Sequence, residues 1–222
     1  MPMTTLALSF RSGTRLVWMR RVSQLLVGLF LYGFAIALMV RAGIGVGPWD
    51  VLTLGLVAHT GWDYGLLTNI IGAVVLLLWI PIRQRPGVGT VVNVLLIGPS
   101  ASFGLWLVPQ QTEPWMQGLV FAGGLALLSI ATGLYIGARL GPGPRDGLMT
   151  GLVRRTGWKV WMVRTGIEVT VLVVGWLLGG QVGIGTLAFA LLIGPMVNVT
   201  LPLLRVPEGP AITDDQPSDV TT

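Results

Sequence analysis

The sequence contains no cysteine and only one histidine, His59, among its 222 residues. The absence of cysteine excludes a disulfide framework, a thiol nucleophile and a thiolate metal site. One histidine cannot form a histidine metal cluster, and the chain lacks the G-x-S-x-G, H-E-x-x-H and P-loop motifs. We therefore expect no enzymatic activity, no metal and no cofactor.

Charge is also scarce. Charged residues make up 10% of the chain and hydrophobic residues 53%, with a mean hydropathy of +0.78. Soluble domains carry about 25% charged residues, so this composition is typical of membrane proteins. The net charge is +5, but the basic residues lie between apolar runs instead of on a polar face. This placement indicates membrane topology and no nucleic-acid partner.

Six apolar stretches are long enough to cross a hydrocarbon core, which takes about 20 residues. They are residues 22–41, 64–82, 88–108, 117–137, 160–179 and 184–204. With both termini in the cytoplasm, every Lys and Arg except Arg41 and Arg164 falls on the cytoplasmic side. Short cytoplasmic loops are rich in these residues, so the pattern favours six spans. We expect a cytoplasmic N-terminal segment at 1–21 and a disordered cytoplasmic tail at 205–222.

The chain repeats itself at an offset of 96 residues. "GPWDVLTLGLVAHTGW" begins at residue 47 and returns at 143 as "GPRDGLMTGLVRRTGW", with ten of sixteen positions identical. "GVGTVVNVLLIGP" at 87 returns at 183 as "GIGTLAFALLIGP". We infer a duplication, with one membrane repeat at 22–108 and a second at 117–204. Three spans per repeat is an odd number, so the sequence predicts an all-α polytopic protein with two inverted three-helix repeats.

Each repeat also holds a short segment between its first two spans. Residues 48–60 would form a helix of about 20 Å, which is too short for an ordinary crossing. Gly47 and Gly143 suit the position before a helix, and Pro48 and Pro144 suit its first turn. We therefore expect a short re-entrant or interfacial helix in each repeat.

An acidic residue follows each Gly-Pro pair. Asp50 and Asp146 fall at the third helical position, where a carboxylate can satisfy free backbone N–H groups. That capping role explains the acids by itself. The alternative is a role in transport, because an ionisable group inside a membrane protein often marks a substrate or ion pathway. The residue directly before the acid is Trp49 in the first copy and Arg145 in the second. We assign both residues, together with the two acids, to this pathway.

Other polar and breaking residues lie within the spans. Glu168 follows Arg164 by four residues, so it forms either a neutralised pair or a coupling carboxylate. Pro99 and Pro195 interrupt the third and sixth spans at matching points, as hinges or as static kinks. The remaining residues assigned to the pathway are Thr90, Asn93 and Thr186.

The phrases "RAGIGVGPWDVLTLGL" and "RPGVGTVVNVLLIG" resemble the YczE/YitT-type bacterial integral membrane proteins. The likeness covers most of residues 22–204, and the second repeat departs from the pattern at Arg145. The resemblance implies a small polytopic protein of the bacterial inner membrane without enzymatic activity. The residues that match the family pattern are Gly47, Pro48, Trp49, Asp50, Gly87, Gly89 and Thr90.

These observations lead to two functional hypotheses. Inverted repeats are a recurring plan of secondary transporters, with a binding site near the midplane between the repeats. The first hypothesis is therefore a small-solute transporter or exporter, with the lipid bilayer and a small-molecule or ion substrate as partners. The alternative is a non-transporting scaffold or substrate-capture subunit of a larger membrane complex. A homo-oligomer and a membrane partner both stay open.

Overall fold

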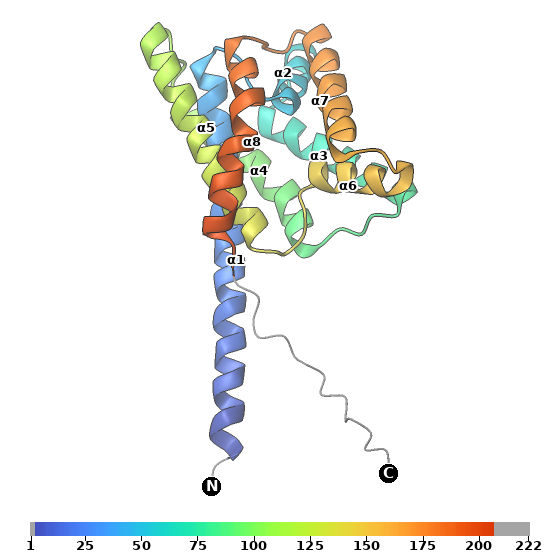
Figure 1. Ribbon diagram of the computed structural model, residues 1–222. Helices are drawn as coiled ribbons and strands as arrows, with labels where there is room; N and C mark the ends of the chain where they lie inside the picture. Colours follow the sequence, from blue (N-terminus) through green and yellow to red (C-terminus); the bar gives the residue numbers. More distant parts are fainter. Residues whose placement is uncertain (1–2, 207–222) are drawn as a thin grey trace.

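The computed structural model describes residues 3–206, which fold into helices without any strand (Figure 1). The predicted disordered tail lies outside the described residues except for 205 and 206. The helices are α1 (Met3–Ala42), α2 (Pro48–Thr60), α3 (Tyr64–Ile82), α4 (Val88–Leu107), α5 (Pro114–Gly137), α6 (Pro144–Thr156), α7 (Val160–Leu177) and α8 (Ile184–Leu204).

Six of these helices are long and apolar enough to cross a membrane. They are α1 from Leu16 onward, α3, α4, α5, α7 and α8. The prediction of an all-α chain with six apolar spans is confirmed, and α1 extends further toward the N-terminus than its predicted span. Pro99 and Pro195 lie inside continuous helices, α4 and α8.

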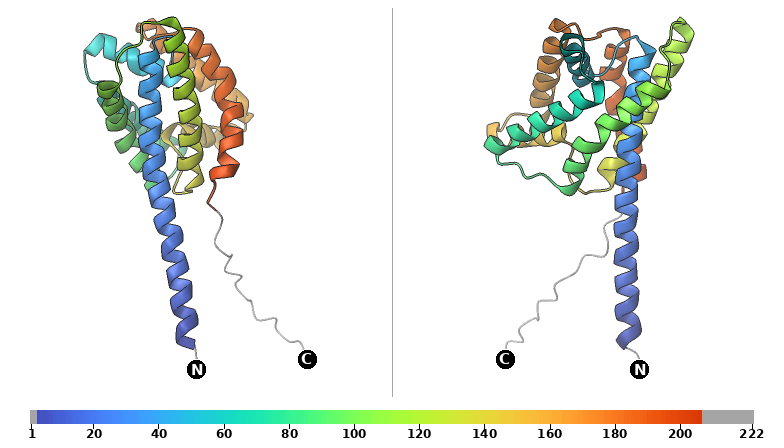
Figure 2. Two further views of the ribbon diagram at one scale, coloured as in Figure 1. Left: turned by 90° about the vertical axis from the view of Figure 1, so that its left-hand side faces the viewer. Right: turned by 180° about the vertical axis from the view of Figure 1, so that it is seen from behind.

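The helices pack both within and between the two halves of the chain. α4 packs on α1 and α8 packs on α5 within the halves, while α1 lies along α5 between them (Figure 2). The short helices also make contacts between the halves, because α2 packs on α7 and α6 packs on α3. Each short helix is therefore supported by a long helix of the other half.

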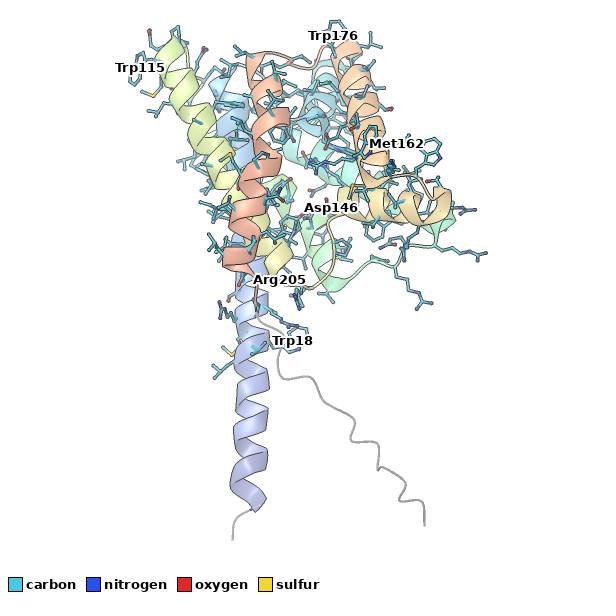
Figure 3. The ribbon with its side chains drawn as sticks, in the orientation of Figure 1. Trp18, Trp115, Asp146, Met162, Trp176 and Arg205 are labelled. Atoms are coloured by element: carbon cyan, nitrogen blue, oxygen red, sulfur yellow. The ribbon has the colours of Figure 1, made fainter. Side chains whose placement is uncertain are left out.

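The long helices run in both directions through the molecule. Figure 1 shows α1 and α7 rising toward the upper end and α5 and α8 descending from it. Trp115 at the start of α5 and Trp176 near the end of α7 share the upper end, while Trp18 and Arg205 lie toward the lower end (Figure 3). In Figure 1, α2 is near the upper end and α6 is lower.

Both short helices begin and end in the same way. The backbone at Gly47 and Gly143 is extended, and a proline starts the helix directly afterward. Each helix ends at a glycine in the left-handed region, Gly61 at φ 69° and Gly157 at φ 71°. Glycine adopts this conformation without the steric cost of a Cβ atom, which explains why both copies stop after thirteen residues.

Two equivalent backbone hydrogen bonds tie the halves together ahead of the short helices. The Gly185 N–H donates to the Ile44 carbonyl at 2.8 Å, and the Gly89 N–H donates to the Leu140 carbonyl at 2.8 Å. Both members of one bond are 96 residues from their counterparts in the other. Each loop that leads into a short helix is therefore held by the start of α4 or α8 from the opposite half.

A threonine completes each of these contacts. The Thr186 hydroxyl accepts from the Val46 N–H at 3.2 Å, while the Thr90 hydroxyl donates to the Pro142 carbonyl at 2.7 Å. Proline has no N–H to offer, so the direction of the second bond is reversed. We call each backbone bond and its threonine bond a loop clasp.

Glycine is required where the loops meet the clasps. Gly45 has φ +118°, and a Cβ there would lie 2.7 Å from the Thr186 hydroxyl oxygen. Gly141 has φ +130°, and its Cβ would lie 2.9 Å from the Thr90 hydroxyl oxygen. Both the backbone conformation and the close approach exclude a side chain at these two positions.

Loss of a clasp hydroxyl will destabilise the protein. Thr186→Val leaves the buried Val46 N–H without its acceptor, which costs about 1–3 kcal/mol of unfolding free energy. Thermal melting in detergent micelles will measure the effect, with Thr112→Val in an exposed loop as the matched control. Equal melting temperatures for the two variants would contradict a structural role for the clasp.

Candidate functional site

Asp50 lies in the first turn of α2 and is almost completely buried, with 3% of its surface exposed. The Tyr64 hydroxyl donates to its Oδ1 atom at 3.0 Å. The Arg145 guanidinium lies 3.9 Å from the same oxygen. A buried carboxylate needs such partners because its desolvation is expensive. Arg145 belongs to α6 and Asp50 to α2, so this ion pair joins the two halves of the chain.

Arg145 also contacts the residue beside Asp50. Its guanidinium carbon lies 4.9 Å from the centre of the Trp49 ring, within the range of a cation–π interaction. The Arg145 side chain is about one-third exposed. Trp49 and Arg145 occupy equivalent positions in the two repeats, and the structure brings them face to face.

Asp146, in the first turn of α6 (Figure 3), has a different environment from Asp50. The Tyr135 hydroxyl donates to its Oδ2 atom at 2.7 Å, and the Tyr135 ring packs edge-on against Tyr32 with centroids 5.8 Å apart. Within residues 3–206, no basic side chain forms a salt bridge with Asp146. The two duplicated acids therefore differ in their partners.

A second charged pair lies on α7. Arg164 Nε is 3.1 Å from Glu168 Oε1, four residues along the same helix. Both side chains are partly exposed, so their mutual contribution to folding is small. The opposite charges of Arg164 and Glu168 neutralise each other, and both side chains remain partly exposed at the surface of α7.

These groups surround one cavity of about 330 Å³, to which all eight helices contribute lining residues. Its charged lining residues are Asp50, Arg145, Asp146, Arg164 and Glu168. Its polar lining includes Tyr32, Thr68, Asn93, Thr132, Tyr135 and Asn198. The volume falls within the range of small-molecule pockets, toward its lower limit. The described residues hold no group of three or more His, Asp or Glu side chains placed to bind a metal.

Most of the residues assigned to the pathway or to the helix starts line this cavity. They are Gly47, Pro48, Trp49, Asp50, Asn93, Gly143, Pro144, Arg145, Asp146 and Glu168. Thr90 and Thr186 lie outside the lining and serve the loop clasps. Pro99 and Pro195 also lie outside it.

The tyrosines of the site were not predicted from the sequence. The chain has three, and Tyr32, Tyr64 and Tyr135 all belong to the site. A usable signal was present, because a hydroxyl within a membrane span needs a hydrogen-bond partner or a polar cavity. The duplication could not reveal these tyrosines, since their counterparts 96 residues away are not tyrosine.

Removal of Arg145 will destabilise the protein through Asp50. Arg145→Ala leaves a buried carboxylate without its base, and we expect a loss of about 1–3 kcal/mol because the arginine is partly exposed. The loss will be smaller in an Asp50→Asn background. Thermal melting of the four combinations measures this coupling, and the exposed Arg154→Ala is the control. Additive effects at positions 50 and 145 would contradict the ion pair.

Comparison with known proteins agrees with this membrane architecture. Residues 19–202 match the family described as "Family of unknown function (DUF6198)". An "Uncharacterized protein" of Haemophilus influenzae is 35% identical over 192 residues, covering 86% of this chain and 88% of its own. The "Uncharacterized membrane protein YczE" of Bacillus subtilis is 34% identical over 177 residues, covering 79% and 82% respectively.

A more distant relative, the "Uncharacterized protein YyaS" of Bacillus subtilis, is 26% identical over 188 residues, or 81% of this chain and 91% of its own. No solved structure matches the chain. The resemblance to YczE-type proteins is confirmed by the family match and by the second relative. The chain belongs to the DUF6198 family and is a multi-pass membrane protein of the YczE type.

Proposed function

We propose that this protein is a secondary transporter of a small solute in the bacterial inner membrane, working without a catalytic step or cofactor. The observation that carries the proposal is the cavity that holds five charged side chains and is lined by both halves of the chain. Charged groups inside a membrane protein are costly and mark substrate or ion pathways.

The relation between the halves supports an inverted-repeat plan. α1 and α5 are equivalent in the duplication and run in opposite directions, and the loop clasps are reciprocal. In this plan α2 and α6 enter the membrane from opposite sides and bring their acidic first turns toward one interior. Transporters with this symmetry place the substrate between the repeats. The proposal puts both termini in the cytoplasm, which the excess of Lys and Arg in the loops on that side supports.

The halves also differ in a way that suits alternating access. α3 packs closely on α4, whereas α7 and α8 form no comparable contact within the described residues. A Cβ at Gly98 on α4 would lie 2.0 Å from Asn69 Oδ1 on α3. The equivalent Gly194 on α8 has open space around its Cβ position. In this proposal the separation of α7 from α8 is the open side of the cavity in the present conformation.

If the packed arrangement of α3 on α4 and the separated arrangement of α7 and α8 were exchanged, the cavity would open on the opposite side of the membrane. α7 would then close on α8, and α3 would separate from α4, which opens the cavity to the other side. Inverted repeats permit this exchange because each half can adopt the conformation of the other. Gly194 then becomes a contact point, as Gly98 is now.

A second candidate function is a scaffold or substrate-capture subunit of a larger complex. It is favoured by an apolar groove of about 620 Å³ between α3 and α7, a surface that an apolar segment of another protein could cover. A subunit of this kind would bind its partner stoichiometrically in native membranes and show no flux of its own.

Engineered disulfides test the conformational exchange, and the absence of native cysteine leaves a clean background. A Cβ at Gly72 would lie 3.6 Å from the Val94 Cβ, within the disulfide range of about 3.5–4.5 Å. We expect Gly72→Cys with Val94→Cys to cross-link readily. The equivalent pair, Glu168→Cys with Ala190→Cys, will cross-link when α7 closes on α8, and either bond will stop transport.

Cross-linking yields and solute flux in proteoliposomes will be measured on the same samples, before and after reduction. Each single-cysteine variant is a control for loss of the native side chain. Formation of the 72–94 bond alone, with no 168–190 bond under any solute gradient, would contradict alternating access and favour the scaffold.

A further inference from the structure

One carboxylate of the cavity, Asp146, has no basic partner among residues 3–206. Three carboxylates and two guanidinium groups line the cavity. Arg145 lies beside Asp50, and Arg164 pairs with Glu168. Asp146 accepts a hydrogen bond from Tyr135 and has no basic partner among the described residues. An ionised carboxylate in a membrane interior is expensive to leave in that condition.

The duplication explains why Asp146 lacks a basic partner. The basic partner of Asp50 is Arg145, which lies in the other half of the chain. The position equivalent to 145 in the first repeat is 49, where the chain has a tryptophan. The second half thus provides Asp50 with the cationic side chain of Arg145, whereas the first half has the aromatic side chain of Trp49 at the equivalent position.

The aromatic groups of the cavity suit a cation. The Trp49 ring already holds a guanidinium, that of Arg145, with its carbon 4.9 Å from the ring centre. The cavity also exposes Tyr32 and Tyr135, whose rings pack together at 5.8 Å. Aromatic rings attract ammonium and guanidinium groups through their quadrupoles.

The groups around Asp146 converge on the start of α6. A Cβ placed on Gly143 would lie 3.2 Å from Asp146 Oδ2, 3.2 Å from the Tyr135 hydroxyl and 3.6 Å from Asn93 Nδ2. The carboxylate and the hydroxyl oxygen of this cluster can accept hydrogen bonds from an N–H donor group. A desolvated inorganic cation such as Ca²⁺ needs about six to eight oxygen ligands, more than this cluster supplies.

We infer that the cavity recognises a small organic cation, an amine or a guanidine, whose charged group pairs with the Asp146 carboxylate. The inference rests on the transport function proposed above and names its substrate class. Asp146 takes the direct role, Tyr135 orients its carboxylate, and the Tyr32 ring beside Tyr135 lies next to the cationic group. The cavity volume of about 330 Å³ limits the solute to a small molecule.

Ligand binding to the full-length protein in lipid nanodiscs tests this inference. The probes are butylamine and butylguanidine, compared with the neutral butanol, the anionic butyrate and Na⁺ alone. We expect the two organic cations to raise the melting temperature and to bind measurably by calorimetry. Asp146→Asn will weaken this binding by about tenfold or more, since it removes the one lining carboxylate that has no basic partner among the described residues. The exposed Glu113→Gln is the control and will bind as the wild type does.

The wild-type comparison decides the question even if Asp146→Asn fails to fold. Equal or stronger stabilisation by butanol, butyrate or Na⁺ would overturn the inference, as would undiminished amine binding by Asp146→Asn. A parallel flux assay separates this inference from the proposed function. Flux of anionic or neutral solutes would keep the transporter and reject its cation selectivity, whereas cation binding without any flux would keep the recognition site and reject transport.

Discussion

The need to satisfy every backbone polar group away from water constrains this structure most strongly. The loops ahead of α2 and α6 are irregular, so their N–H and C=O groups have no helix to pair with. The clasps provide this pairing through the Gly185–Ile44 and Gly89–Leu140 bonds, each from the opposite half. The short helices can therefore begin inside the protein, and their acidic first turns are held in place. Neither half can build its own loop without the other.

The two duplicated acids, Asp50 and Asp146, have different electrostatic environments in the cavity. Asp50 is buried, and its base comes from the other half of the chain through Arg145. Asp146 is more accessible and is held by a neutral hydroxyl. One ancestral motif has thus diverged into an internally neutralised site and an open one. This asymmetry leaves one acid of the cavity paired with an arginine and the other without a basic partner among the described residues.

The sequence predicted the regular elements well because their signals are local. Proline and glycine mark the beginning and end of α2, and apolar length marks the spans, so both were correct. The site was harder to predict. Tyr64 and Tyr135 reach the duplicated acids from α3 and α5, and no spacing rule connects residues on separate helices. The clasp role of Thr90 and Thr186 was also hidden, because a polar residue in a span has the same appearance whether it lines a cavity or binds a loop.

The central claim is that the two halves are inverted, with α2 and α6 entering from opposite faces of the membrane. Single cysteines at the equivalent exposed positions Ala58 and Arg154 test it most directly. Cells that produce the Ala58→Cys or the Arg154→Cys variant would be treated with a membrane-impermeant maleimide before and after permeabilisation, and labelling of the cysteine would be measured. The account predicts that position 58 reacts from outside the cell and that position 154 reacts only after permeabilisation. Labelling of both positions from the same side would contradict it.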